Sequence, residues 1–150
     1  MKVYYPIFLD LTDRPVLVAG AGRIALRKTK ALVESGARVT VVAPEILPAF
    51  RSLDARLLER RFRVSDLNGV RLAFAATNVR AVNRRIALEA ERRGVPVNVA
   101  DAPAECGFLV PSRVRRGHLQ IAVSTSGRNP RLAKKLRQDL EDLLRRATME

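Results

Sequence analysis

Short apolar runs alternate with longer amphipathic stretches over the first two thirds of the chain. The runs that predict strands cover residues 16–19, 38–42, 56–62, 70–76 and 95–99. They are rich in Val, Leu and Ala, as expected of strands that are buried on both faces. Residues 24–33 and 79–93 carry apolar side chains at helical spacing, and a glycine follows each stretch. Strands that alternate with helices predict an α/β fold with a doubly wound parallel sheet.

Three shorter segments connect these elements. Residues 6–11 form an apolar lead-in that is either a short strand or a plug against the sheet. Residues 46–53 predict a short helix, and the polar sequence of residues 65–69 predicts a turn. None of these segments interrupts the alternation of strand and helix.

The pattern changes after residue 112. A basic cluster comes first, made of Arg113, Arg115, Arg116 and His118. Residues 119–123 then alternate in character and predict a strand, and the polar loop 124–130 leads into a helix with Asn129 as N-cap and Pro130 at its first position. The helix is expected to end near Ala147, and its apolar stripe consists of Leu132, Leu136, Leu140, Leu143 and Leu144. Such a stripe must be buried, so it packs either on the chain's own sheet or on a second copy of the chain.

A glycine pattern lies between the first predicted strand and the first predicted helix. Gly20, Gly22 and Ala25 occupy the three positions of a G-x-G-x-x-A fingerprint. Gly20 permits the tight turn, Gly22 lets a pyrophosphate approach the backbone, and Ala25 allows the helix to pack closely on the strand. The helix N-terminus also offers free N–H groups to an anion. The motif predicts a dinucleotide-binding, Rossmann-like domain, with a glycine turn that binds nothing as the alternative.

The carboxyl ends of the predicted strands meet at one rim of the sheet, where folds of this kind bind their ligand. The residues that we expect to bind the cofactor there are Gly20, Ala21, Gly22, Arg23, Ile24, Pro44, Glu45, Thr77 and Asn78. An acid for the ribose is expected at the tip of the second strand, but Val42 and Ala43 stand there and Glu45 is the first acid. Glu45 is either that acid or only the N-terminal acid of the next helix. The pattern leaves NAD and NADP both open, with Arg38 or Arg51 as partners for a 2′-phosphate.

The formal net charge of +13 points to an anionic partner. Nucleic acid, a membrane surface and a polyanionic small molecule are the three candidates, and arginine's planar fork suits carboxylate and phosphate groups. A surface on which arginine has replaced lysine would give the same charge. The chain has only five Phe, two Tyr and no Trp, and no basic run studded with aromatic residues, which argues against nucleic acid.

Cysteine usage and the N-terminal sequence indicate the compartment. Cys106 is the single cysteine, which excludes an intrachain disulfide and fits a reducing cytoplasm. The first ten residues are broken by Pro6 and Asp10 and make a poor signal peptide. No apolar run reaches about 18 residues, so no transmembrane helix is expected. With no His or second Cys near it in sequence, Cys106 indicates neither a nucleophile nor a zinc site, and we expect no metal site.

Further motifs accompany the fingerprint along the chain. They are Pro6-Ile7-Phe8-Leu9-x-Leu11, Arg27-Lys28, Gly36-Ala37, Val41-x-Ala43-Pro44, Ala75-Ala76-Thr77 with Asn83, Val97-Asn98-Val99-x-Asp101, Phe108 with Pro111, Arg116-Gly117, and Ser124-Thr125-x-Gly127-x-x-Pro130-x-Leu132-Ala133-x-x-Leu136-Arg137-x-x-x-Glu141. Over nearly its whole length the chain therefore resembles the precorrin-2 dehydrogenase/sirohydrochlorin ferrochelatase family, the N-terminal module of siroheme synthase.

The resemblance implies an NAD-dependent oxidation of precorrin-2 to sirohydrochlorin by a homodimer whose site lies between the subunits. It also implies two parts, an NAD-binding Rossmann domain at residues 1–112 and a dimerisation segment at residues 113–150. Some members insert ferrous iron as well. Many members continue into a further helical domain, whereas this sequence ends at Glu150, so we expect the dehydrogenase step and leave iron insertion open. Asn78 also departs from the family, because many members carry an acid there.

The resemblance assigns Asp101 as the catalytic residue, because it matches the family's catalytic aspartate. Its place after the last predicted strand suits a base, although an Asp before Ala-Pro also makes an Asx turn. For the polycarboxylate tetrapyrrole substrate we expect contacts from Arg116, His118, Ser124 and Thr125. His118 is either an acid/base group or a strand-face histidine, and Ser124 and Thr125 either bind substrate or shape the turn. The competing function is a regulatory module that senses NAD(H), which needs neither Asp101 nor the Ser-Thr-x-Gly loop.

Overall fold

The computed structural model describes residues 2–146, which divide into two units. The larger unit spans Pro6–Phe108. Of the described residues, 2–5 and 109–146 form the smaller unit.

A five-stranded parallel sheet organises the larger unit, with strand order β3-β2-β1-β4-β5. The strands are β1 (Pro15–Ala19), β2 (Arg38–Ala43), β3 (Ala55–Glu59), β4 (Leu72–Ala75) and β5 (Val97–Val99). The chain leaves β1 toward β3 and then returns to the other side of β1 at β4. The order thus reverses between β1 and β4, and this switch point is where folds of this kind open a crevice for a ligand. The predicted doubly wound sheet is confirmed.

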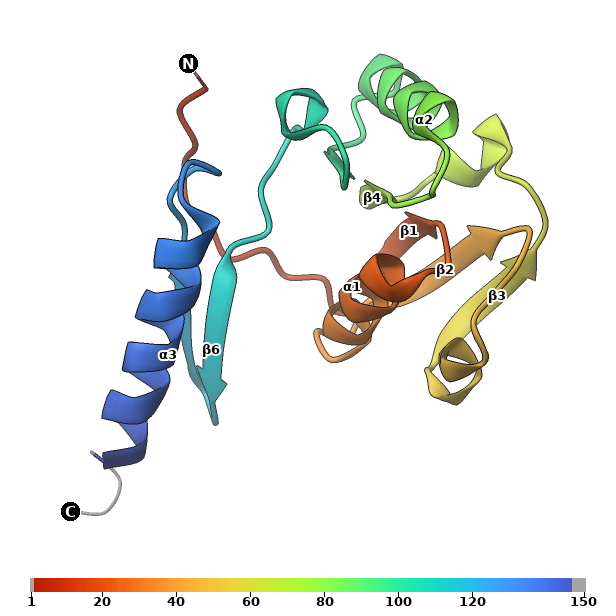
Figure 1. Cartoon of the computed structure of the whole chain (residues 1–150). Coiled ribbons are helices and arrows are strands. Elements are labelled where there is room, and N and C mark those ends of the chain that lie inside the picture. Colours follow the sequence, from red (N-terminus) through yellow and green to blue (C-terminus); the bar gives the residue numbers. More distant parts are fainter. Residues whose placement is uncertain (1, 147–150) are drawn as a thin grey trace. The chain divides into compact units, whose positions relative to one another are not determined.

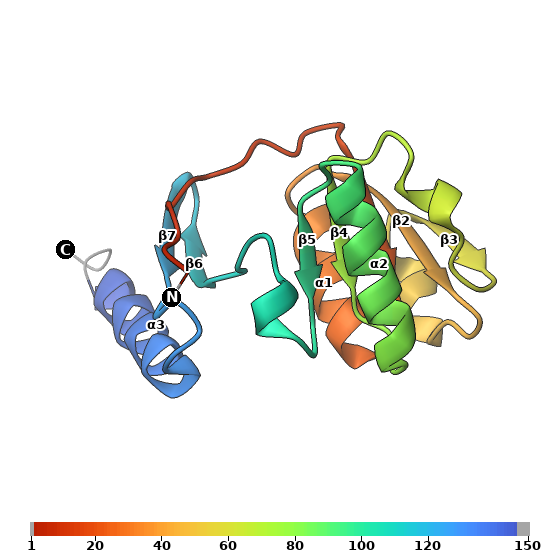
Figure 2. The ribbon, with the colours of Figure 1, turned by 90° about the horizontal axis from the view of Figure 1, so that it is seen from above.

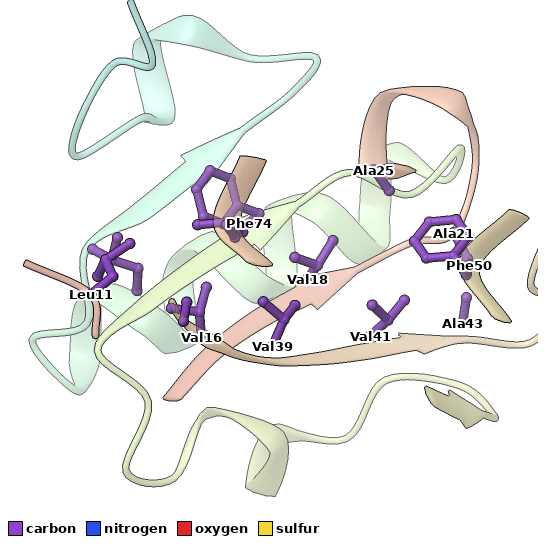
Figure 3. Packing of buried hydrophobic residues seen from close by; sticks show 13 residues of the cluster. Leu11, Val16, Val18, Ala21, Ala25, Val39, Val41, Ala43, Phe50 and Phe74 are labelled. Carbon is purple, nitrogen blue, oxygen red and sulfur yellow. The ribbon is translucent and has the colours of Figure 1, made fainter. Parts of the chain in front are cut away.

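Two helices cover opposite faces of this sheet (Figures 1 and 2). Helix α1 (Arg23–Val33) packs on the face that carries Val16 and Val18 of β1. Helix α2 (Arg80–Arg92) packs on the other face, which carries Leu17 and Ala19. Successive strand residues point to opposite faces, so one continuous apolar run supplies both cores. Figure 3 shows the first core, with side chains from β1, β2 and β4 lining up beside Ala25 of α1.

Three connections differ from the sequence-based expectations. The predicted helix at residues 46–53 is a short 3-10 helix, η1 (Pro48–Ser52), which buries Phe50 in the first core. The strand predicted to reach residue 62 ends at Glu59, and a second 3-10 helix, η2 (Val64–Leu67), follows it. The lead-in at residues 6–11 forms no strand, and Ile7 and Phe8 are 67% and 71% exposed. Only Leu11 of that segment joins the core.

The smaller unit is an antiparallel hairpin with a helix packed on it. Strands β6 (Ser112–Arg116) and β7 (Leu119–Val123) pair, and α3 (Pro130–Arg146) contacts both. Strand β6 was predicted only as a basic cluster, because its one inward side chain, Val114, stands between exposed arginines. Asn129 caps α3 as predicted, since its Oδ1 accepts a hydrogen bond of 2.9 Å from the N–H of Leu132. The predicted end near Ala147 lies outside the described residues.

The apolar stripe of α3 divides into two parts. Leu140 and Leu144 are half-buried, and their spacing places them on the same side of the helix as the buried Ala133, which the predicted stripe did not include. Leu132, Leu136 and Leu143 are exposed by 44%, 40% and 61%. The helix therefore keeps a row of exposed leucines within its own unit.

Candidate functional site

The loop between β1 and α1 begins at Gly20, a position that only glycine can occupy. Gly20 has φ +110°, and a Cβ built on it would stand 2.2 Å from the carbonyl oxygen of Ala76. The N–H of Gly20 also donates to the carbonyl of Val42 over 2.9 Å. Because Gly20 has no side chain, the loop can pack closely against the carboxyl ends of β2 and β4, at the switch point of the sheet.

Gly22 has a different role, because among residues 2–146 no neighbouring atom lies within 4 Å of the position that its Cβ would take. Gly22 is the N-cap of α1, no side chain caps this helix end, and its first turn holds no acidic residue. Ala25, in the first turn of the helix, is fully buried against the sheet. An open approach to glycine backbone and uncapped N–H groups at a helix N-terminus fit the pyrophosphate of a dinucleotide.

The residues around β2 show which side chains are placed to contact the ribose of the cofactor or its 2′-phosphate. Pro44 and Glu45 are exposed just beyond the strand, and the N–H of Leu47 lies 3.5 Å from the carbonyl of Ala21 in the glycine loop. Helix η1 starts only at Pro48 and has no acid in its first turn, so Glu45 is not a helix N-terminal acid. Arg38 is the first residue of β2, at the rim opposite the strands' carboxyl ends, and donates its Nε to the carbonyl of Asp13. Arg38 is therefore removed as a partner for a 2′-phosphate, whereas Arg51 lies in η1, beyond the carboxyl end of β2.

A buried asparagine joins two of the site residues named from the sequence. Asn83 of α2 is fully buried, and its Nδ2 donates to the carbonyl of Thr77 over 3.0 Å and to Oδ1 of Asp101 over 3.1 Å. Its Oδ1 accepts from the N–H and the hydroxyl of Thr77, over 3.0 and 2.7 Å. Asn83 thus uses all of its polar groups to connect the end of β4 to Asp101.

Two charged residues complete the surroundings of Asp101. Nη1 of Arg80 lies 3.6 Å from Oδ1 of Asp101, and Nη2 of the same guanidinium pairs with Oε1 of Glu105. Glu105 lies in the short 3-10 helix η3 (Pro103–Glu105), four residues after Asp101. One cation therefore stands between two carboxylates at the carboxyl end of β5.

Two largely buried side chains, Cys106 and Asn98, hold the segment that carries Asp101 in place. Sγ of Cys106 accepts from the N–H of Val99 at 3.1 Å and lies 3.3 Å from its carbonyl oxygen, so the cysteine holds the loop against β5. Asn98 donates to the carbonyl of Phe108 over 3.1 Å and accepts from Nζ of Lys28 over 2.9 Å. Burial, more than the nearby Arg27 charge, lowers the pKa of Lys28 below its ordinary value. These contacts connect β5 to α1, the helix that follows the glycine loop.

The four residues expected to contact substrate lie in the smaller unit. His118 is exposed in the turn between β6 and β7, so it is not on a strand face. Arg116 ends β6 and donates to the carbonyl of Leu144 in α3. Oγ of Ser124 accepts from the N–H of Ser126 at 3.1 Å, and Oγ1 of Thr125 accepts from the N–H of Asn129 at 3.0 Å. The two hydroxyls therefore shape the loop before α3.

Sequence reasoning missed Arg80, Glu105 and the role of Asn83. A usable signal existed for Asn83, since it is a polar residue on the inward face of a helix, in line with Ile86 and Ala90. An inward polar side chain needs partners, so it points to a network. Arg80 gave no signal, because it is one of several arginines on the same helix.

Among residues 2–146, no three His, Cys, Asp or Glu side chains gather closely enough to hold a metal ion. Within the same range, no helix has the length and apolar character needed to cross a membrane.

Comparisons with known proteins identify the family of the chain. Residues 7–112 match the family model described as "Putative NAD(P)-binding", and residues 116–143 match the one described as "Sirohaem biosynthesis protein central". A siroheme synthase of Methylobacillus flagellatus is 47% identical over 143 residues, covering 93% of this chain and 31% of the relative. A siroheme synthase of Neisseria meningitidis is 43% identical over 145 residues, covering 94% of this chain and 30% of the relative. The chain thus spans less than a third of the length of these relatives.

A solved structure gives the same result. The structure of SirC, a precorrin-2 dehydrogenase, superposes with a TM-score of 0.79 at 32% identity, covering 93% of this chain and 70% of that one. The fold and the glycine loop define a Rossmann-like NAD(P)-binding protein. The chain belongs to the precorrin-2 dehydrogenase and siroheme synthase family, which confirms the resemblance seen in the sequence motifs.

Proposed function

We propose that this chain oxidises precorrin-2 to sirohydrochlorin with NAD as the electron acceptor, a step of siroheme biosynthesis. The observation that carries the proposal is the hydrogen bond from Asn83 to Asp101, which fixes a carboxylate beside the end of β4. Thr77 and Gly20 lie next to each other at the carboxyl end of β4. The relatives named siroheme synthase and precorrin-2 dehydrogenase support the choice of reaction.

The residues assigned to the cofactor are those at the carboxyl rim of the sheet. The backbone of Gly20, Ala21, Gly22, Arg23 and Ile24 would hold the pyrophosphate, and Pro44, Glu45, Thr77 and Asn78 would line the nucleoside groups. When bound, NAD accepts the hydride that the oxidation releases. Glu45 is the acid for a ribose diol, and an acid at that place favours NAD over NADP, whose 2′-phosphate it would repel.

Asp101 is assigned as the base that takes the proton. Its Oδ1 is engaged by Asn83 and Arg80, whereas within the described residues its Oδ2 accepts no hydrogen bond. Oδ2 is therefore the atom left for a proton from the substrate. A base held in one orientation beside the reacting carbon needs less reorganisation during the reaction.

The smaller unit is assigned to the substrate's carboxylates and to assembly. Arg116 supplies a planar cation, and His118, Ser124 and Thr125 supply hydrogen-bond donors. We assign the exposed row of Leu132, Leu136 and Leu143 to the contact between two copies of the chain, and on this assignment we propose a homodimer. Cys106 is buried and, as the single cysteine of the sequence, forms no intrachain disulfide, which suits the reducing cytoplasm to which we assign the enzyme.

The proposal is tested by mixing the purified protein anaerobically with precorrin-2 and NAD⁺. We expect NADH absorbance to rise together with the absorbance of sirohydrochlorin, and NADP⁺ to support a slower reaction. No absorbance change with either cofactor, in a preparation that binds NAD, would favour the regulatory module that senses NAD(H) instead. Adding ferrous iron to the completed reaction tests separately whether the chain also inserts the metal.

A further inference from the structure

We propose that Arg80 is a positioning residue for Asp101, itself held in place by Glu105. The inference rests on the proposed function, since it concerns the orientation of the base in that reaction. The guanidinium and the Asn83 amide together engage Oδ1 of Asp101, so that Oδ2 alone is left to take the proton.

The geometry of the guanidinium supports this role. Its two terminal nitrogens have different partners, Nη1 facing Asp101 at 3.6 Å and Nη2 pairing with Glu105. A planar group held at two points has a fixed orientation, which a flexible ammonium group would not have. Arg80 is also the first residue of α2, so its backbone is held by the same helix that carries Asn83.

Glu105 and Asp101 both carry carboxylates, and the guanidinium of Arg80 forms an ion pair with each of them. Two carboxylates four residues apart repel each other, and each then favours a position away from the other. Oε2 of Glu105 is buried and has no hydrogen-bond partner among the described residues, so Oε1 and its pair with Arg80 carry the contacts of this side chain. Removing Arg80 therefore leaves Asp101 with the Asn83 hydrogen bond but takes away the cation between the two carboxylates, so that the charge of Glu105 is no longer compensated.

A purely structural role would give a different result. The side chains of Arg80, Asp101 and Glu105 are exposed by 45%, 39% and 33%, and ion pairs as exposed as these contribute little to the stability of a protein. Losing the pair should leave the melting temperature nearly unchanged. Its loss should appear in turnover, because a misplaced base slows proton transfer without weakening the binding of the cofactor.

The kinetic test uses Arg80→Ala, Arg80→Lys, Glu105→Gln and the double variant, with Arg84→Ala as the matched control. Arg84 lies one turn further along α2 and is exposed, so its removal changes the net charge equally. We expect Arg80→Ala to lower kcat by roughly 10- to 100-fold with the NAD affinity unchanged. Arg80→Lys should recover part of that loss, and Glu105→Gln should add less than about twofold in the Arg80→Ala background, because it acts through Arg80.

A second readout does not depend on turnover. The side-chain amide protons of Asn83 report on Asp101 directly, since one of them is bonded to its Oδ1. In NMR spectra of the protein with NAD, we expect Arg80→Ala to shift the Asn83 side-chain amide signal and Arg84→Ala to leave it in place. An unshifted Asn83 signal in Arg80→Ala would overturn the proposal even if the wild-type protein failed to oxidise precorrin-2. Full turnover of Arg80→Ala, in an enzyme that Asp101→Asn inactivates, would overturn it while the proposed function stands.

Discussion

The amide of Asn83 and the carboxylate of Asp101 are joined by a hydrogen bond of 3.1 Å between Nδ2 and Oδ1. Asn83 belongs to α2, and Asp101 follows β5, the next strand in the chain. The contact therefore connects α2 to the carboxyl end of β5. The same asparagine holds the backbone of Thr77 at the end of β4. One buried amide thus sets the distance between two strand ends at the rim of the sheet.

Asn83→Ala is expected to lower the free energy of unfolding by about 1–3 kcal/mol, because it leaves half-buried polar groups of Thr77 without their Asn83 partners. Urea denaturation measures the change. Asn78→Ala is the control, because Asn78 is exposed just beyond the same strand. A variant as stable as the wild type would mean that water replaces the amide at no cost.

Asp101→Asn is expected to bind NAD normally and to lose turnover by roughly 10²- to 10⁴-fold, the usual contribution of a general base. Asn keeps the oxygen that accepts from Asn83 but cannot take a proton. Isothermal titration with NAD and an anaerobic assay separate the two effects. Near wild-type turnover in the folded variant would remove Asp101 from the mechanism and leave it the role of an Asx turn.

The two glycines of the loop should respond differently to the same change. Gly20→Ala is expected to prevent folding or to lower the melting temperature strongly, since its Cβ would stand 2.2 Å from the Ala76 carbonyl oxygen. Gly22→Ala should fold normally, because that Cβ meets no atom within 4 Å. Circular dichroism during heating distinguishes them.

Gly22→Asp should also fold but should lose NAD binding, because its carboxylate would occupy the approach of the pyrophosphate. Fluorescence titration with NADH measures the loss, and Gly22→Ala provides the folded control. Unchanged affinity in a folded Gly22→Asp variant would contradict the assigned position of the cofactor.

Leu136→Glu combined with Leu143→Glu is expected to convert a dimer into a monomer. Both side chains are exposed on α3 within its own unit, and a dimer contact over them would bury two unpaired charges. Gln138→Glu is the control, since it adds charge at another exposed position of the same helix. Analytical ultracentrifugation at micromolar concentration gives the mass, and a monomeric wild type would contradict the assignment.

Asp66 should make the stability of the larger unit sensitive to acid. Its hydrogen bonds with the Arg60 guanidinium, at 2.7 and 2.9 Å, hold the pKa of the carboxyl below its ordinary value of 3.8. Since the folded state binds this proton more weakly than the unfolded chain, the stabilisation is complete above pH 3.8 and is lost as the pH falls through the lowered pKa. Asp66→Asn should therefore be less stable than the wild type at pH 7, and the difference should narrow as the pH falls through the lowered pKa. A difference that does not depend on pH would contradict this assignment.

The sequence by itself determined the main elements and their order. Five apolar runs, two amphipathic stretches and the Gly20, Gly22 and Ala25 pattern predicted the parallel sheet and its ligand-binding rim. These features are local, because they depend on the spacing of side chains along one strand or helix. The lead-in at residues 6–11 and strand β6 were predicted less well, because their apolar positions are too few to define a period.

Only the tertiary structure decided what surrounds Asp101. Arg80, Asn83 and Glu105 come from two segments separated by β5, and a sequence pattern cannot show that their side chains meet. The sheet brings them together because parallel strands end at the same rim, so the residues that follow β4 and β5 lie side by side. A pairing between distant residues is a property of the packed fold, whereas periodicity is a property of the chain.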